Sequence, residues 1–189
     1  MREQASIEII KNKLDIEPHF VLDPTFLLEK TDYLQLIKNF SIEIDLKKNY
    51  LCVYLLDKSE NISNYINKIA QELKYNILYL TPFSKNYIEN FLYSINICKS
   101  IITDSFHGTV FSIIFEKPFL SFINTNRGNS RFFSLNQTFD LYNRIIYPKK
   151  FEKKDIDILT NKPIINKTKF YELKKYSIMF LKKNLGLIK

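Results

Sequence analysis

The fold is predicted most directly from residues 100–110, which read SIITDSFHGTV. The short apolar run Ser100–Thr103 indicates a buried strand, and the apolar spacing of Phe106–Phe115 indicates a helix. That helix must end before Pro118, because the residue preceding a proline avoids the helical region. A second apolar run, Phe119–Ile123, follows at once. The sequence here therefore predicts a strand, a helix and a second strand in succession.

The same alternation is found upstream of this stretch. Two apolar runs, Tyr50–Leu56 and Ile77–Leu80, indicate strands, and Asn61–Leu73 and Asn86–Ile97 indicate helices. Strands that alternate with helices form a parallel sheet with helices on both faces. We therefore predict an α/β fold, a three-layer domain whose four strands lie in one sheet.

The two ends of the chain are less regular. Near the N-terminus we predict a helix at Glu3–Lys13, a strand at Phe20–Leu22 and a helix at Asp32–Phe40. From Lys149 onward the chain becomes rich in lysine and largely helical. The predicted organisation is one α/β domain at residues 1–148 and a basic tail at residues 149–189.

The charge of the chain is concentrated in that tail. Residues 149–189 contain 12 lysines and 4 acidic residues, an excess equal to the net charge of +8 of the whole chain. A uniformly basic face would favour nucleic acid, whereas a single basic tail suits a membrane surface or an acidic partner. We therefore expect no nucleic-acid partner and allow peripheral membrane contact through the tail.

The last helix of the tail has an apolar stripe, which predicts that it docks onto another surface. We expect the stripe to be more exposed than the core, unless the helix simply closes over its own sheet. The side chains that decide this are Phe170, Leu173, Phe180 and Leu181.

Membrane-spanning, secreted and metal-binding classes receive no support from the sequence. No run approaches the roughly 20 apolar residues of a membrane span, and the N-terminus lacks the apolar core of a signal peptide. Cys52 and Cys98 are isolated in apolar segments, without disulfide or metal-ligand spacing. We expect a cytoplasmic protein with no metal ligands.

The strongest candidate site follows the strand at Ser100–Thr103. Ligands of open α/β sheets bind beyond the carboxyl ends of the strands, and either Asp104 or Ser105 can cap the next helix. His107 then falls in the first helical turn, where a helix attracts anions, and Gly108 would let a ligand approach the backbone. The positive helix end disfavours a protonated His107 until an anion binds. An interpretation of equal weight is that His107 has a structural role and forms a hydrogen bond to a neighbouring strand.

Two further polar clusters are weaker candidates. Arg127 and Arg131 lie in a polar loop after the strand Phe119–Ile123, and Arg131 opens a predicted helix, where a cation is unfavourable. That local cost suggests that Arg131 binds an anion through two hydrogen bonds, although a solvated loop is slightly favoured. Asp23, before Pro24, could orient a substrate hydroxyl, but a simple turn is the better interpretation.

These residues resemble a known family. The stretch DSFHGTVFS at residues 104–112, followed by Lys117-Pro118-Phe119, resembles the signature of polysaccharide pyruvyl transferases. The block RGNSRF at residues 127–132 and the N-terminal pair Arg2-Glu3, with VLDPTFLL at residues 21–28, are similar to other parts of the family pattern. The similarity runs from Arg2 to about Arg144 and corresponds to the C-terminal half of the family.

The resemblance implies a Rossmann-like domain like the C-terminal domain of a two-domain GT-B fold. It implies transfer of pyruvate from phosphoenolpyruvate, the donor substrate, to two hydroxyls of a saccharide acceptor as a ketal. The products belong to exopolysaccharide and capsule biosynthesis, so the work is expected in the cytoplasm, at the inner face of the membrane. No cofactor or metal is implied.

The resemblance also assigns roles to residues. His107 is implied as the acid or anion ligand, and Arg2 and Arg131 as cationic clamps. Ser105 stands where some family members carry an arginine, so Arg127 or Arg131 is expected to replace that cation. Ser105 and Gly108 complete the expected substrate-binding residues.

The family pattern begins before the start of this chain, and three interpretations follow. The chain is a pyruvyl transferase domain that needs an N-terminal-half partner chain, or a nucleotide-sugar-binding glycosyltransferase domain, or an inactive folded remnant. We expect a truncated form of the first kind.

Overall fold

The computed structural model describes residues 1–57, 59–81 and 86–188. The chain forms two compact units, which are described separately. The sheet unit comprises residues 29–124 and 142–163. The terminal unit comprises residues 1–28, 125–141 and 164–189. The boundary expected at Lys149 remains a prediction from the sequence.

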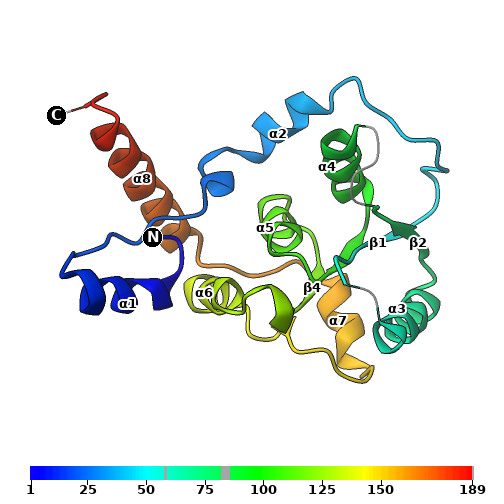
Figure 1. The fold of residues 1–189 in the computed structure, drawn as a ribbon. Helices are drawn as coiled ribbons and strands as arrows, with labels where there is room; N and C mark the ends of the chain where they lie inside the picture. The colour runs from blue at the N-terminus through cyan, green and yellow to red at the C-terminus, as the bar shows by residue number, and fades with distance from the viewer. Residues whose placement is uncertain (58, 82–85, 189) are drawn as a thin grey trace. The chain divides into compact units, whose positions relative to one another are not determined.

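The sheet unit is built on a five-stranded, all-parallel sheet (Figure 1) with the order β2-β1-β3-β4-β5. Its strands are β1 (Tyr50–Tyr54), β2 (Asn76–Tyr79), β3 (Ser100–Thr103), β4 (Phe119–Phe122) and β5 (Ile145–Ile146). The four predicted strands are thus confirmed in one sheet. Strand β5 escaped prediction because two residues are too few to show a pattern.

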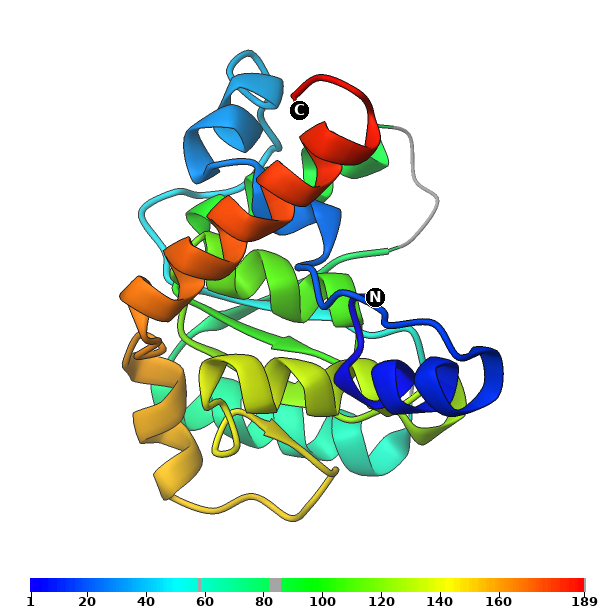
Figure 2. The same cartoon turned by 90° about the vertical axis from the view of Figure 1, so that its left-hand side faces the viewer.

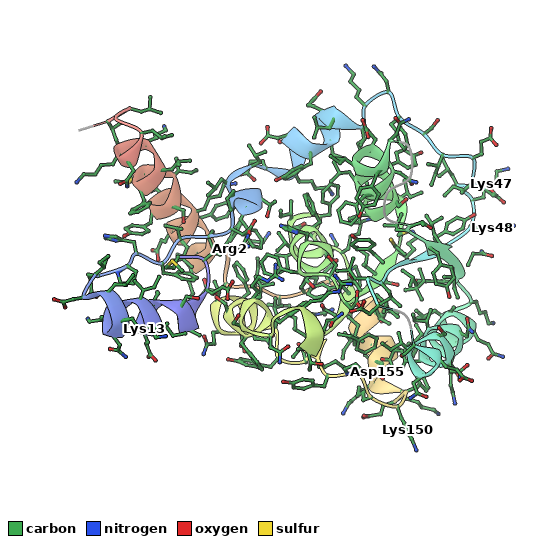
Figure 3. All side chains as sticks on the ribbon, viewed as in Figure 1. Arg2, Lys13, Lys47, Lys48, Lys150 and Asp155 are labelled. Carbon is green, nitrogen blue, oxygen red and sulfur yellow. The ribbon has the colours of Figure 1, made fainter. Side chains whose placement is uncertain are left out.

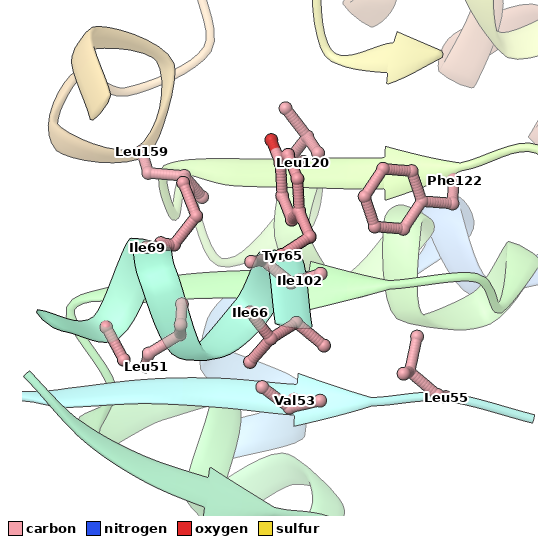
Figure 4. Packing of buried hydrophobic residues seen from close by; sticks show 11 residues of the cluster. Leu51, Val53, Leu55, Tyr65, Ile66, Ile69, Ile102, Leu120, Phe122 and Leu159 are labelled. Atoms are coloured by element: carbon pink, nitrogen blue, oxygen red, sulfur yellow. The ribbon is translucent and has the colours of Figure 1, made fainter. Parts of the chain in front are cut away.

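Helices cover both faces of this sheet, which confirms the three-layer prediction. On one face, Leu51 and Val53 of β1 pack in the core with α3 (Glu60–Leu73) and α7 (Lys154–Thr160) (Figure 4). On the other face, the ring of Tyr54 lies 5.2 Å from that of Phe91 in α4 (Tyr87–Ile97). Helices α2 (Lys30–Leu36) and α5 (Phe106–Ile114) belong to this second layer, since Tyr33 and Phe91 both pack on Phe111.

A buried arginine ties α7 to the sheet. Arg144, 6% exposed, immediately precedes β5. Its Nη1 donates to the carbonyl of Ile158 at 2.7 Å, and its Nη2 donates to the carbonyls of Asn161 and Lys162. Burial lowers the pKa of Arg144. These bonds satisfy carbonyls at the end of α7, which have no partner within a helix, and fix the end of α7 to the start of β5.

The terminal unit is helical. It contains α1 (Gln4–Leu14), the 3₁₀ turns η1 (Pro24–Leu27) and η2 (Thr125–Arg127), α6 (Ser130–Phe139) and α8 (Lys167–Asn184), which are coloured blue, yellow-green and red in Figure 2. Its core is aromatic, because the rings of Phe26, Phe139 and Phe170 lie 5.3 to 5.8 Å apart. Helix α8 also contacts η1, so the three chain segments of the unit share one core.

The prediction of a strand at Phe20–Leu22 is wrong. The N–H groups that a sheet would have used are bound elsewhere, because Val21 N donates to the Met1 carbonyl at 2.8 Å and Leu22 N donates to Ser177 Oγ at 2.9 Å. The helix predicted at Asp32–Phe40 begins earlier, at Lys30, and ends at Leu36.

The stripe of α8 is more exposed than the core, as predicted. Phe170, Leu173 and Phe180 are half-buried and Leu181 is 47% exposed. Much of the stripe nevertheless packs within the terminal unit, since Phe170 meets Phe26 and Phe180 meets His19. The docking of α8 onto a further surface stays a prediction.

Candidate functional site

The candidate site lies at the carboxyl edge of the sheet, next to the gap between β1 and β3. The chain leaves β1 toward β2 on one side, and β3 lies on the other side of β1. Such a reversal of strand order opens a crevice, which is where doubly wound sheets bind ligands. The segments after β1, β3 and β4 supply the polar side chains at this edge.

Three side chains at this edge form a hydrogen-bonded network, in which Asp104 and Asn124 are buried and Asp57 is half-buried. Asp104, 4% exposed, accepts hydrogen bonds from the backbone N–H groups of Leu56 at 2.6 Å and Asp57 at 3.0 Å. Asn124 Nδ2 donates to Asp57 Oδ2 at 2.6 Å and to Asp104 Oδ2 at 3.1 Å. One amide therefore bridges two carboxylates. Because a buried carboxylate is costly unless hydrogen-bonded, this network fixes the loops after β1, β3 and β4 against one another.

The start of α5 is capped by Ser105. Its Oγ accepts from Gly108 N at 3.3 Å, and its carbonyl accepts from Thr109 N at 3.0 Å. Thr103 supports this cap, because its Oγ1 donates to the Tyr54 carbonyl at 2.7 Å and accepts from Ser105 N at 3.0 Å. Ser105 is 5% exposed. The sequence indicated either Asp104 or Ser105 as the N-cap of this helix. The N-cap is Ser105, and Asp104 instead binds the backbone of the loop after β1.

His107 is the second residue of α5 and is exposed. Its ring lies edge-on to that of Phe106, with 5.3 Å between centroids. Phe106 is 7% exposed and therefore anchors the first helical turn. The first N–H groups of a helix have no partner within the helix, and the helix dipole adds positive potential there. An exposed imidazole at this place can accompany a bound anion.

Gly108 is explained by packing. It is buried, and a Cβ added there would lie 3.0 Å from Thr103 Cβ and 3.1 Å from Thr103 Cγ2. The space left by the absent side chain is thus taken by Thr103, so that α5 can approach the end of β3. The expected approach of a ligand to this backbone has no support from the packing and stays a prediction.

Arg2 and Asp23 are brought together in the terminal unit. Arg2 Nη1 pairs with Asp23 Oδ2 at 2.5 Å, and Arg2 is labelled in Figure 3. Asp23 also accepts from Thr25 N at 3.1 Å and Thr25 Oγ1 at 2.7 Å, so it caps η1. The turn favoured from the sequence is present. Asp23 has a second role that the sequence did not show, since it orients the Arg2 guanidinium.

The other two arginines also belong to the terminal unit. Arg127 ends η2 and is exposed. Arg131 is the second residue of α6, and its Nη2 donates to the Arg127 carbonyl at 2.8 Å. Nearby, Ser130 Oγ donates to Glu3 Oε2 at 2.5 Å, which joins the start of α6 to the N-terminal segment. The cationic residues predicted from the sequence thus share one unit, and His107 belongs to the other.

A comparison with protein-family models decides the family. The model of the polysaccharide pyruvyl transferase family matches residues 1–126, two thirds of the chain. The chain belongs to the polysaccharide pyruvyl transferase family. No curated protein matches the sequence significantly.

The matched residues contain most of the predicted site. They include Arg2, Ser105, His107 and Gly108, and they end one residue before Arg127. This pyruvyl transferase domain therefore has a family-supported segment around His107, whereas the block with Arg127 and Arg131 lies outside the matched range.

Sequence reasoning missed two members of the network at the sheet edge. Neither Asp57 nor Asn124 is singled out by the sequence, although Asn124 begins the polar loop that follows Phe119–Ile123. Their partner, Asp104, is 47 residues from Asp57 and 20 residues from Asn124. The signal that could have found them is positional, because each follows a predicted strand at its carboxyl end.

The described residues show no helix that is both long enough and apolar enough to cross a bilayer. Within the same ranges, no three His, Cys, Asp or Glu side chains gather where they could hold a metal ion.

Proposed function

We propose that this pyruvyl transferase domain binds phosphoenolpyruvate and takes part in transferring its pyruvyl group to two hydroxyls of a saccharide, forming a ketal. The observation that supports this most is the placement of His107, exposed in the first turn of α5 at the carboxyl edge of the sheet, inside the family-matched segment. The proposal includes the GT-B arrangement with a second domain that the resemblance implies.

The proposed reaction needs one proton donor and several cationic contacts. Protonation of the terminal CH₂ carbon of phosphoenolpyruvate converts it to a methyl group and makes C2 electrophilic. A saccharide hydroxyl then adds to C2, the C2–O bond to phosphate breaks, and a second hydroxyl closes the ketal. The protons balance, because the two hydroxyls release two protons in total. One makes up for the proton added to the CH₂ carbon, and the other leaves with the phosphate. A positioned acid and preorganised cations would accelerate these steps.

In this proposal His107 is the acid or the anion ligand. The first turn of α5 contributes positive potential for the phosphate or carboxylate. Ser105 contributes indirectly in this proposal. Its buried Oγ accepts a hydrogen bond from Gly108 N and so stabilises the first turn of α5. The Asp57–Asn124–Asp104 network keeps the turn in place.

The resemblance also implies Arg2, Arg127 and Arg131 as cations for phosphate or carboxylate groups, and we propose that role for them within the terminal unit. The ion pair with Asp23 orients Arg2, and Arg131 is bound to the backbone of Arg127. A guanidinium has five donors in a fixed fork, which suits it to bind carboxylate and phosphate groups through two hydrogen bonds.

We also propose that the domain works at the cytoplasmic face of an anionic membrane, which α8 contacts peripherally. The support is the combination of lysines with exposed apolar side chains on that helix, including Met179 and Leu181.

Calorimetric titration with phosphoenolpyruvate tests the donor. We expect binding that His107→Ala weakens about tenfold or more, as for loss of a charge-assisted hydrogen bond. The matched control is His19→Ala, because His19 is the other of the two histidines and lies in the terminal unit. Absence of phosphoenolpyruvate binding, or equal effects of the two substitutions, would refute the proposal.

The same titration with UDP-glucose separates the competing class. Tight binding of UDP-glucose that depends on His107, without binding of phosphoenolpyruvate, would favour a glycosyltransferase-like domain. If phosphoenolpyruvate binds, incorporation of its labelled pyruvyl group into acid-labile saccharide ketals tests the reaction itself.

A further inference from the structure

A pocket lies at the carboxyl edge of the same sheet, on the face covered by α3 and α7. It has a volume of about 620 Å³ and belongs entirely to the sheet unit. The first half of α3 lines it from Asn61 to Lys68, Phe122 lines it from the end of β4, and the segment Pro148–Phe151 lines it after β5. The pocket is distinct from the start of α5, which lies on the other face of the sheet.

The aromatic wall of this pocket is fixed by packing. The ring of Phe151 stands edge-on to Tyr65, with 6.3 Å between centroids, and Tyr65 stands edge-on to Phe122 at 5.4 Å. Lys68 Nζ lies 5.2 Å from the centroid of the Phe151 ring. This cation–π contact holds an ammonium group beside the wall.

The basic segment beside that wall is fixed by a buried carboxylate. Asp155 is 0% exposed, accepts from Glu152 N at 2.8 Å and pairs with Lys149 Nζ at 2.8 Å. Lys149 also pairs with Glu152 at 2.9 Å. Partial burial lowers the pKa of Lys149, but its bonds to Asp155 and Glu152 outweigh that effect and raise it. Lys150 is thus held between two anchored neighbours, Lys149 and Phe151.

Two of the three lysines that line the pocket have no carboxylate partner among the residues that the structure describes. Lys149 is neutralised by its acidic partners, whereas Lys68 and Lys150 are exposed and no salt bridge involves them. Among the described residues that line the pocket none is acidic, and two of them, Asn61 and Asn64, contribute amides. Two uncompensated cations, two amides and an aromatic wall suit a phosphate attached to a sugar ring.

We propose that this pocket binds a glycosyl phosphate, with Lys68 and Lys150 on the phosphate and the amides and Phe151 beside the sugar. A sugar 1-phosphate and a nucleoside diphosphate sugar share this chemistry. The site is separate from that of phosphoenolpyruvate and does not depend on pyruvyl transfer.

The test is calorimetric titration of the full chain with glucose 1-phosphate, UDP-glucose, inorganic phosphate and glucose. The test variant is Lys68→Ala/Lys150→Ala. The matched control is Lys47→Ala/Lys48→Ala, which removes the same charge from the loop before β1, at the opposite end of that strand. Figure 3 shows this pair well apart from Lys150.

We expect glucose 1-phosphate or UDP-glucose to bind more tightly than phosphate or glucose alone. Whichever of these two ligands binds more tightly shows whether the pocket takes a sugar 1-phosphate or a nucleoside diphosphate sugar. The test variant should weaken that binding about tenfold or more, the control should not, and added salt should weaken it further. Absence of binding, inorganic phosphate binding as well as the sugar phosphates, or equal losses in both variants would overturn the proposal. Phosphoenolpyruvate binding that depends on His107 is measured separately. A negative result with the sugar phosphates would therefore overturn this proposal without affecting the proposed function.

Discussion

At the scale of single residues, the carboxyl edge of the sheet depends on partners that are distant in sequence. The sequence showed that Asp104 or Ser105 would cap a helix, because capping is local. It did not show that Asp104 would hold the backbone of Leu56 and Asp57, because nothing near Asp104 specifies a partner 48 residues away. Local chemistry was therefore predictable, and the network with Asn124 was not.

The bridge formed by Asn124 gives a stability prediction. Asn124→Asp replaces the shared amide donor with a third carboxylate beside Asp57 and Asp104, so unfolding at pH 7 should become easier by about 2–4 kcal/mol. The loss should shrink toward pH 5, as protonation relieves the repulsion. Urea denaturation at both pH values measures this, with the exposed Asn76→Asp as control. A loss that is the same at both pH values would contradict the role of the bridge.

Lys117 gives a pH prediction. Its Nζ donates to the carbonyls of Asn96 at 2.6 Å and Cys98 at 2.8 Å. Burial, with the nearby charge of Lys30, lowers its pKa to about 8. The unfolded state keeps its proton up to the ordinary lysine pKa of about 10.4. Between these values the unfolded state binds more protons, so this contribution to stability rises with pH.

The variant Lys117→Met lacks this titration. From pH 8 to 9.5, wild-type stability should rise relative to the variant by less than about 1.4 kcal/mol per pH unit, because the ammonium is partly exposed. Urea denaturation of both proteins across this range measures the difference. A constant or falling difference would contradict the lowered pKa.

At the scale of elements, the strands and helices with strong apolar periodicity were predicted to within about two residues. The four predicted strands all lie in the sheet, because buried parallel strands show continuous apolar runs. Phe20–Leu22 has the same local pattern but is not a strand, because Met1 and Ser177 bind its N–H groups. The pocket beside α3 was not predicted, since three separate segments form it.

The contact of α5 with β3 predicts the effect of Gly108→Ala. Alanine favours a helix by about 1 kcal/mol, but its Cβ would displace Thr103 and disturb the cap that Thr103 supports. We expect a net loss of about 1–3 kcal/mol in unfolding free energy. A double-mutant cycle with Thr103→Ala should show favourable coupling, because the smaller residue removes the clash. A Gly108→Ala variant as stable as wild type would show that the contact is unimportant.

Helix α8 carries the membrane prediction. The chain should sediment with vesicles that contain phosphatidylserine and not with neutral phosphatidylcholine vesicles, since each lysine near an anionic surface contributes about 1 kcal/mol. Lys182→Ala/Lys183→Ala should reduce this binding, whereas Lys47→Ala/Lys48→Ala should not. Equal sedimentation with both kinds of vesicle, or equal effects of both variants, would count against contact through α8.

At the scale of the whole molecule, the α/β class and the family could be reached from the sequence, because the alternating pattern and the segment around His107 are both contiguous. The grouping of chain segments into two compact units could not, since each unit is assembled from segments far apart in sequence. The central claim is that His107, at the start of α5, belongs to a phosphoenolpyruvate site.

Proton NMR of the histidine rings tests this claim most directly. The chain has only two histidines, so two Cε1–H signals are expected, one from each ring, and His107→Gln assigns them by removing one. Titration with phosphoenolpyruvate at constant pH should shift the His107 signal in a saturable way and leave the His19 signal unchanged. If the His107 signal stays in place at every concentration, or if only the His19 signal moves, the account of the site is wrong.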